Sequence, residues 1–419
     1  MKNQTISTIA LTAALTFAPL ASAQNPRFRV LHNFAAYGSS TDGVIPYGPL
    51  ILDSKGNLYG VTIDGGAGQC SDYGCGIVFE LSLENGGWRE RILHSFAGGN
   101  DGSAPSGSLV LDAKSNLYAT LLGNSSVNVS GVFELTPASR GWTNTSLYNG
   151  YSGPGLISDA QGKLYGSIGP GDYSGAGAIG ELSPGSGGWS YTQLYSFCPQ
   201  QNGCPDGFLL NVPPTWDAKG NLWGVTTEGG ISTSPCFTEE GCGVIFEMTR
   251  TGSGAWAYHV MHHFAASIYD GQWPYGSLVR DSVGNFYGST WLGGFYNHGT
   301  VFKFSRSNGK WKETILYDFP TCTEGCMVEG TLALDSAGNL YGTAAGGTNS
   351  CAGFSCGVVF KLAPQANGRY KYSVLADFSE STGGVQPFYG VILGGKGNLF
   401  GVTSSFGKYG GGTAFEITP

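Results

Sequence analysis

Two short segments in the C-terminal half of the chain concentrate aromatic rings beside polar groups. Exposed aromatic rings stack well on sugar rings and are common anchors at protein interfaces, so these segments are candidate ligand-binding loops. The alternative is that the rings pack on one another and cover the end of a structural unit. The candidate residues are Tyr269, Asp270, Trp273, Tyr275, Trp291, Phe295, Tyr296 and His298.

The short motifs of common catalytic centres are missing from the sequence. No Gly-x-Ser-x-Gly elbow, His-Glu-x-x-His pair, Walker loop or EF-hand loop occurs. Of the six histidines, only His298 falls in a candidate binding loop. A pair of carboxylates for glycoside hydrolysis would have to come from distant parts of the chain, and no pair stands out. The catalytic residues of any enzymatic activity therefore stay unknown.

Ten cysteines form five close pairs, which favours local disulfides that each staple a surface loop. Disulfides between loops are one alternative. A Cys₄ zinc site is another, although zinc ribbons prefer a two-residue spacing and an oxidising compartment opposes free thiols. The pairs are Cys70/Cys75, Cys198/Cys204, Cys236/Cys242, Cys322/Cys326 and Cys351/Cys356.

An Asp-Gly dipeptide recurs before the first apolar run of a repeat, at Asp42, Asp101, Asp206 and Asp270. Aspartates at such positions cap turns through their own side chains, and this is the interpretation that we favour. The alternative is a central acidic ring that holds a cation such as Ca²⁺. We therefore expect no resident metal or other cofactor, with Ca²⁺ as the alternative.

A repeated phrase shows which elements must position these residues. Asp53-Ser-Lys-Gly-Asn-Leu-Tyr-Gly60 returns about every 57 residues, and its last copy is degraded. The Asp-x-x-Gly-Asn part predicts a hairpin turn in which Asp caps its own backbone and Gly or Asn takes positive φ. The later copies begin at Asp112, Asp159, Asp217, Asp281, Asp335 and Gly394.

Each repeat carries four short apolar runs, which in the first copy are Gly48 to Leu52, Asn57 to Thr62, Gly76 to Leu81 and Trp88 to Phe96. Four strands per unit at this period are typical of a propeller blade. Seven copies predict an all-β, seven-bladed β-propeller. Phe28 to Phe34 is a fourth run without the first three, and the C-terminus supplies the first three without a fourth. The N-terminal strand is thus expected to complete the last blade and close the ring.

The repeated motifs resemble those of a known family. Asp-x-x-Gly-Asn-Leu-Tyr-Gly, a Gly-Gly loop, Gly-x-Val-Phe-Glu-Leu and Trp-x-x-x-x-Leu-Tyr-x-Phe are similar to the GloVer tandem-repeat family of exported bacterial proteins. The resemblance covers nearly all of the chain after residue 23. It implies a repeat architecture and no established activity, because the shared motifs carry no catalytic residue.

Composition narrows the class of protein. Glycine accounts for 70 of 419 residues, aromatics for 13% and charged residues for 12%, which excludes a disordered chain, a coiled coil and a helical bundle. The net charge is −8, so no basic surface is available to grip nucleic acid. No segment is long and apolar enough to span a membrane.

Residues 1–23 have the pattern of a signal peptide, with Lys2, an apolar stretch and Ala21-Ser22-Ala23 as the cleavage site. We therefore expect a secreted or periplasmic protein in which residues 24–419 form one propeller domain. The leading hypothesis for function is a binding module for an extracellular polysaccharide or protein. A carbohydrate-active hydrolase or lyase with carboxylates at the central pocket is the alternative, and a structural envelope or matrix protein is the third.

Overall fold

The structure of the protein is a computed structural model that describes residues 26–38, 41–70, 72–123, 130–169, 176–199, 204–231, 241–265, 267, 269–351, 354–381 and 383–418. The expected signal peptide at residues 1–23 lies outside the described residues. Within the described part of the chain, no helix combines the length and the apolar content of a membrane span.

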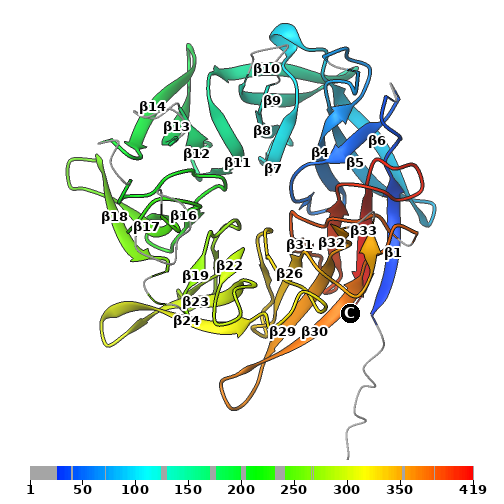
Figure 1. Ribbon diagram of the computed structural model, residues 1–419. Helices are drawn as coiled ribbons and strands as arrows, with labels where there is room; N and C mark the ends of the chain where they lie inside the picture. Colours follow the sequence, from blue (N-terminus) through cyan, green and yellow to red (C-terminus); the bar gives the residue numbers. More distant parts are fainter. Residues whose placement is uncertain are drawn as a thin grey trace, which may run out of the picture.

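The described strands form seven antiparallel sheets arranged as the blades of a ring (Figure 1). Blade 1 consists of β2 (Gly43–Pro46) with β3 (Ile51–Leu52), β4 (Leu58–Gly65), β5 (Ile77–Glu84) and β6 (Gly87–Ser95). Blade 2 consists of β7 (Pro105–Leu111), β8 (Leu117–Leu121), β9 (Gly131–Ala138) and β10 (Gly141–Asn149), and blade 3 of β11 (Ser152–Ser158), β12 (Leu164–Ile168), β13 (Ala178–Gly185) and β14 (Gly188–Ser196). Blade 4 consists of β15 (Thr215–Trp216), β16 (Leu222–Thr226), β17 (Val244–Arg250) and β18 (Trp256–His263).

Blades 5 to 7 follow the same order from the axis outward. Blade 5 consists of β20 (Val279–Arg280), β21 (Phe286–Thr290), β23 (Thr300–Ser307) and β24 (Lys310–Asp318). Blade 6 consists of β25 (Ala333–Leu334), β26 (Leu340–Ala344), β29 (Val358–Pro364) and β30 (Tyr370–Asp377). Blade 7 consists of β31 (Val391–Leu393), β32 (Leu399–Thr403), β33 (Thr413–Thr418) and β1 (Arg27–Asn33). The loops add the pairs β19 (Gly271–Gln272) with β22 (Leu292–Gly293) and β27 (Ser350–Cys351) with β28 (Phe354–Ser355), and the 3₁₀ turn η1 (Gly99–Asp101).

The ring closes as expected, because the N-terminal strand completes blade 7. β1 pairs antiparallel with β33, and Phe28 lies opposite Ile417 in that register. Phe34, which is fully buried just after β1, packs on Phe79 of blade 1 at 5.0 Å between ring centroids. The first and last parts of the described chain therefore share one sheet, and the sheet edge that an open repeat would leave is covered.

The core lies between the blades rather than at the axis. The second strands of blades 2 to 7 are buried along their whole length, as in Leu117–Leu121 and Leu399–Thr403, and the first five residues of β4 in blade 1 are buried as well. Tryptophans at the start of the fourth strands pack across this layer, and Trp311 stacks on Phe304 at 5.2 Å.

The repeated Asp turn also forms as expected. Asp53 Oδ1 accepts hydrogen bonds from the backbone N–H groups of Lys55 and Asn57, and Gly56 has φ of 92°. Asp53 Oδ2 accepts from the Tyr59 hydroxyl, so one carboxylate ties the turn to the second strand. Burial opposes the charge, but these hydrogen bonds outweigh it and hold the pKa of Asp53 below its usual value.

The local disulfides Cys70–Cys75, Cys198–Cys204, Cys322–Cys326 and Cys351–Cys356 are present. The predicted pairing is confirmed for these eight residues. The remaining pair includes Cys236, which lies outside the described residues.

Candidate binding site at the axial channel

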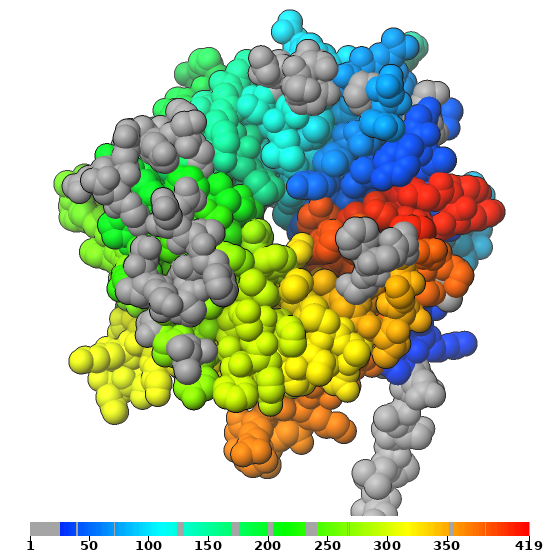
Figure 2. All heavy atoms as spheres, in the orientation of Figure 1, coloured from blue at the N-terminus to red at the C-terminus, as the bar shows by residue number. Residues whose placement is uncertain are grey.

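A channel runs along the axis of the ring, and Figure 2 shows the hollow at its centre. Its volume is about 1550 Å³. The walls come from the first strand of each blade and from the turn that precedes that strand. Because every blade contributes one such turn, the residues at corresponding positions of the seven repeats meet around one space.

The turn before the first strand adopts the same unusual backbone in six blades. One non-glycine residue in each has φ between 52° and 66°, a region that costs a bulky residue about 1–3 kcal/mol. At Trp273 the N–H donates to Cys242 O of blade 4, and the C=O accepts from Trp291 N of its own blade, at 3.0 Å each. The turn thus joins neighbouring blades. The six residues are Ile45, Ala104, Leu209, Trp273, Met327 and Gln386.

In blades 1 and 4 to 7, the first strand that follows this turn is only two or three residues long, shorter than the expected five-residue run. Proline follows the positive-φ residue in blade 5, as Pro274, and it has no N–H to give to the ladder. Only Val279 and Arg280 then pair with β21. Further along the turn, the first strands approach closely, and a Cβ on Gly330 would lie 2.1 Å from Gly390 N. Glycine is needed at that position because the neighbouring backbones nearly touch around the axis.

Two or three residues after the positive-φ position, and at the corresponding position of blade 3, each blade places one residue in the channel wall. Blades 5, 6, 7 and 1, which are consecutive around the ring, contribute the larger groups. Blades 2 to 4 contribute Gly107, Gly153 and Asn211 there, with Tyr151 beside them. The channel wall is therefore asymmetric, with aromatic and acidic groups on one side. We call this side the axial arc; it consists of Tyr47, Tyr275, Glu329 and Tyr389.

Glu329 is the chemical centre of the axial arc. It is the only carboxyl group among the described residues that line the channel. Burial raises its pKa to about 7, and a hydrogen bond from the Trp291 indole opposes that rise. The Trp291 ring lies 6.1 Å from the Tyr275 ring and 5.7 Å from the Trp273 ring. On the other side of Glu329, Tyr389 contacts Tyr47 at 5.1 Å.

The candidate binding loops of blade 5 divide into two aromatic groups. Trp273, Trp291 and Tyr275 form the inner group beside the axial arc. Tyr269, Phe295 and Tyr296 form an outer group with exposed fractions of 56%, 64% and 49%. The Tyr269 and Phe295 rings are nearly parallel at 5.9 Å, so part of this surface packs on itself. The two groups are held by the β19–β22 pair.

Asp270 and His298 do not join either aromatic group as site residues. Asp270 is buried at the junction of blades 4 and 5, where its Oδ2 lies 3.3 Å from His262 Nε2. Asp42, Asp101 and Asp206 occupy the corresponding positions at other junctions, and none of the four is among the described residues that line the channel. The His298 C=O accepts from Met327 N, so its backbone supports the turn that leads to Glu329.

The sequence-based interpretation missed Tyr47, Glu329 and Tyr389. A signal was present, because Ile45-Pro-Tyr-Gly48 and Trp273-Pro-Tyr-Gly276 are the same phrase in blades 1 and 5. The phrase is weaker elsewhere, and Glu329 stands where those two blades have Tyr. Identifying the position requires the repeats to be aligned on this turn rather than on the Asp-x-x-Gly-Asn phrase.

Several solved structures are similar to this chain at low identity. They include a Bacteroides uniformis protein provisionally assigned as a 6-phosphogluconolactonase, with 13% identity over 77% of this chain and 83% of that chain and a TM-score of 0.47. A glucose dehydrogenase has 11% identity over 94% and 99%, with a TM-score of 0.42. A luciferin-regenerating enzyme has 11% identity over 94% and 96%, with a TM-score of 0.42. Likeness at this level carries no argument about ligand or activity.

No curated protein matches this chain. The sequence model of the Gloeobacter/Verrucomicrobia repeat matches it twice, over residues 20–237 and 237–419. These two matches cover nearly the whole length and agree with the repeated motifs and the blades that they form. This protein therefore belongs to the Gloeobacter/Verrucomicrobia repeat family.

Proposed function

We propose that this protein is an exported binding module whose axial arc holds an extracellular polysaccharide. The observation that carries the proposal is the grouping of three tyrosines around one half-buried carboxyl group in the channel wall. Tyrosine rings offer apolar faces for sugar rings, and their hydroxyls and Glu329 offer hydrogen bonds to sugar hydroxyls. The four disulfides and the leader-like residues 1–23 support export.

The charge of the protein favours a neutral or amine-bearing sugar chain over an anionic one. The net charge is −8, and the axial arc itself contributes an acid. An anionic polymer would meet repulsion from the surface and from Glu329 once that group is ionised. The ligand class that fits best is therefore a neutral or amino-sugar polysaccharide that presents a chain end to the channel.

The test is retention of the tag-free protein on insoluble polysaccharides, with cellulose, chitin and xylan as neutral chains, chitosan as a cationic chain and cross-linked polygalacturonate as an anionic chain. We expect retention on at least one neutral or cationic chain and none on polygalacturonate. Tyr389→Ala should weaken retention, whereas Tyr409→Ala should not. Tyr409 is the matched control because it is 51% exposed and lies outside the channel wall.

One observation favours an enzyme as the second candidate. Glu329 has a pKa of about 7, which suits a general acid or base at neutral pH. The two-carboxylate scheme of most glycosidases needs a second acid, which the described lining residues do not supply. A lyase that uses one base would fit better. New reducing ends or unsaturated products in the retention assay, lost in Glu329→Gln, would favour this candidate over the binding module.

A further inference from the structure

The junctions between neighbouring blades follow one rule. The reference position is the residue that directly follows a fourth strand, which is Phe in six blades and Gly150 in blade 2. The residue two positions before it faces the residue six positions before the reference position of the next blade. Three junctions fill these positions with tyrosine pairs whose rings are 3.9 to 4.9 Å apart. These are apolar contacts that need no charge. The pairs are Tyr148 with Tyr191, Tyr195 with Tyr258, and Tyr317 with Tyr372.

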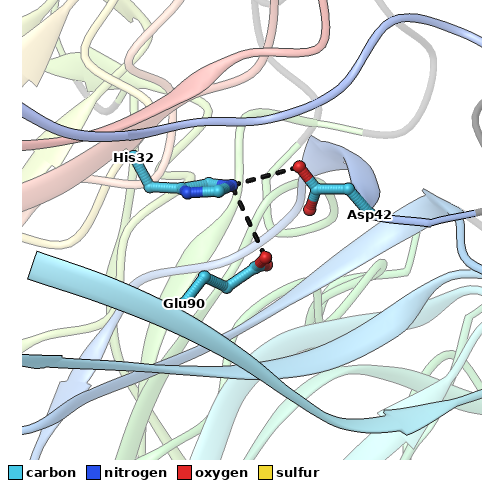
Figure 3. A group of neighbouring side chains, drawn as sticks. All are labelled: His32, Asp42 and Glu90. Atoms are coloured by element: carbon cyan, nitrogen blue, oxygen red, sulfur yellow. Dashed lines mark hydrogen bonds and ion pairs between the residues drawn. The ribbon is translucent and has the colours of Figure 1, made fainter.

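Two other junctions place a histidine and a glutamate at the same positions. At the junction of blades 7 and 1, His32 Nε2 lies 3.2 Å from Asp42 Oδ2 and 3.7 Å from Glu90 Oε2 (Figure 3). In Figure 3 the His32 ring points between the two carboxyl groups.

The second cluster repeats this arrangement at the junction of blades 4 and 5. His262 Nε2 lies 3.3 Å from Asp270 Oδ2 and 3.6 Å from Glu313 Oε2. The third residue of each cluster, Asp42 or Asp270, comes from the loop that leads into the next blade. Two sites on different sides of the ring thus present the same three functional groups.

The hydrogen bonds of the described residues leave both clusters incomplete. Glu90 Oε1 and Glu313 Oε1 are buried and have no hydrogen-bond partner, and the same holds for His262 Nε2. The Glu313 side chain is only 10% exposed. One imidazole can balance at most one carboxylate, so a second buried carboxylate in each cluster lacks a counter-charge.

In each cluster, one ligand atom from each of the three residues lies within 4.8 Å of the other two. A buried carboxylate without a counter-charge costs free energy. A cation between the three groups would remove this penalty.

A third histidine junction shows the arrangement that needs no cation. His94 Nε2 lies 3.0 Å from Asp101 Oδ1, but the facing residue is Asn144 rather than glutamate. The Asn144 amide donates to Asp101 Oδ1 at 2.8 Å, and Ala97 N donates to Oδ2 at the same distance. Burial is outweighed here by these donors and by His94, and the pKa of Asp101 is lowered. The negative charge of this single carboxylate is therefore stabilised by hydrogen-bond donors of the protein, and it needs no bound cation.

We propose that the clusters His32–Asp42–Glu90 and His262–Asp270–Glu313 are two zinc-type divalent cation sites that join neighbouring blades. Zinc binds His nitrogen and carboxylate oxygen at about 2.0–2.2 Å, so ligand atoms around a tetrahedral ion are about 3.3–3.6 Å apart. The observed separations from the imidazole nitrogens to the carboxylate oxygens are 3.2 to 3.7 Å. The imidazole distinguishes these sites from a calcium site, whose ligands are all oxygens. A water molecule would complete the tetrahedron.

The proposed ions have a structural role that follows from their place. The first cluster connects β1, the N-terminal strand that closes the ring, to β6 of blade 1. The second connects β18 of blade 4 to β24 of blade 5. Each ion would tie the outer strands of two blades that otherwise meet through side-chain packing. Zinc binding should therefore raise thermal stability independently of any ligand in the channel.

The test measures zinc in the tag-free protein after treatment with EDTA, addition of zinc and removal of free metal by gel filtration. We expect two zinc ions per chain, one in Glu90→Gln, one in Glu313→Gln and none in the double variant. Asp101→Asn at the third junction is the matched control and should keep two. Zinc should raise the melting temperature of the wild type and have no effect on that of the double variant.

The melting temperatures of the variants without metal show whether they fold. They should equal or exceed the melting temperature of the metal-free wild type, because each variant lacks a buried ionisable carboxyl group. Glu90→Asn and Glu313→Asn provide a second pair that copies the Asn144 arrangement. A wild type that retains no zinc would overturn the proposal. A double variant that folds and still retains two zinc ions would also overturn it.

Discussion

The indole of Trp291 donates a hydrogen bond to the carboxyl group of Glu329, which links a loop of blade 5 to the channel wall of blade 6. The backbone N–H of Trp291 also donates a hydrogen bond to the backbone carbonyl oxygen of Trp273, at 3.0 Å. The aromatic loop thus orients the single acid of the axial arc. In the proposed binding module, this loop positions Glu329 and also presents ring faces to a ligand.

The raised pKa of Glu329 predicts how stability depends on pH. The folded-state pKa is about 7, above the ordinary value of 4.5, so the folded protein binds the proton more tightly between these values. The free energy of unfolding should therefore fall as pH rises from about 4.5 to 7 and change no further from this group above that range. Glu329→Gln should remove this slope and be more stable than the wild type at pH 8 by up to about 3 kcal/mol.

The measurement is urea unfolding of both proteins at intervals from pH 5 to pH 8. Glu324→Gln is the control, because Glu324 is an exposed acid of the same blade. Equal slopes for the wild type and Glu329→Gln would show that Glu329 titrates normally.

Trp291→Phe tests the hydrogen bond itself. Phenylalanine keeps most of the ring contact but cannot donate, and the indole donor is what lowers the pKa of Glu329 against its burial. The pKa of Glu329 should therefore rise further above 7. Its carboxyl carbon can be followed by NMR in protein labelled at glutamate, with Trp88→Phe as the control because Trp88 packs at a distant junction. A fall or no change in this pKa would contradict the assigned contact.

Closure of the ring predicts a large loss of stability on truncation at Phe34. This side chain is fully buried and packs between blades 7 and 1. Phe34→Ala should lower the free energy of unfolding by about 3–5 kcal/mol. Tyr37→Ala, three residues along and 50% exposed, should change it by about 0.5 kcal/mol or less. Thermal unfolding of the two variants checks this; equal effects would mean that the junction is not part of the core.

The disulfides predict a modest and local stabilisation. The link between Cys70 and Cys75 closes a loop with a sequence separation of 5, which contributes about 2 kcal/mol in the chain-entropy model. The double variant Cys70→Ser/Cys75→Ser should lose about this amount in thermal unfolding under non-reducing conditions. The same variant and the wild type should unfold alike once reduced. Alkylation of the native protein followed by intact-mass analysis should add no label to the eight paired cysteines, and labelling at these residues would contradict the pairing.

The fold could be predicted well from the sequence because the strands and turns of each repeat are encoded by residues close together in that repeat. The Asp53 turn, the buried run Leu117–Leu121 and the unpaired N-terminal run ending at Phe34 are local signals, and their repetition defines the ring. The function-bearing positions are different. They meet only when the ring closes, and they vary from blade to blade, so Glu329 stands where blades 1 and 5 have Tyr.

The junction clusters were hidden for a related reason. His262 and Glu313 belong to different blades, and neither is unusual within its own strand. Their contact follows from the offset between adjacent fourth strands, which the alternation of apolar and polar residues does not reveal. Asp270 was assigned to a binding loop from its neighbours in the sequence, whereas the fold directs it to the junction. Comparison of corresponding positions across all repeats would have paired these residues.

Binding in the axial arc is tested most directly by the affinity of channel variants for a polysaccharide that retains the wild type. We expect Tyr275→Ala and Tyr389→Ala each to weaken binding about tenfold or more, a loss of about 1.4 kcal/mol, and Tyr269→Ala and Tyr409→Ala to stay within twofold of the wild type. Affinity gel electrophoresis of the four variants and the wild type gives these values in one experiment. Wild-type affinity in both channel variants, or a loss confined to Tyr269→Ala, would contradict the placement of the ligand in the axial arc.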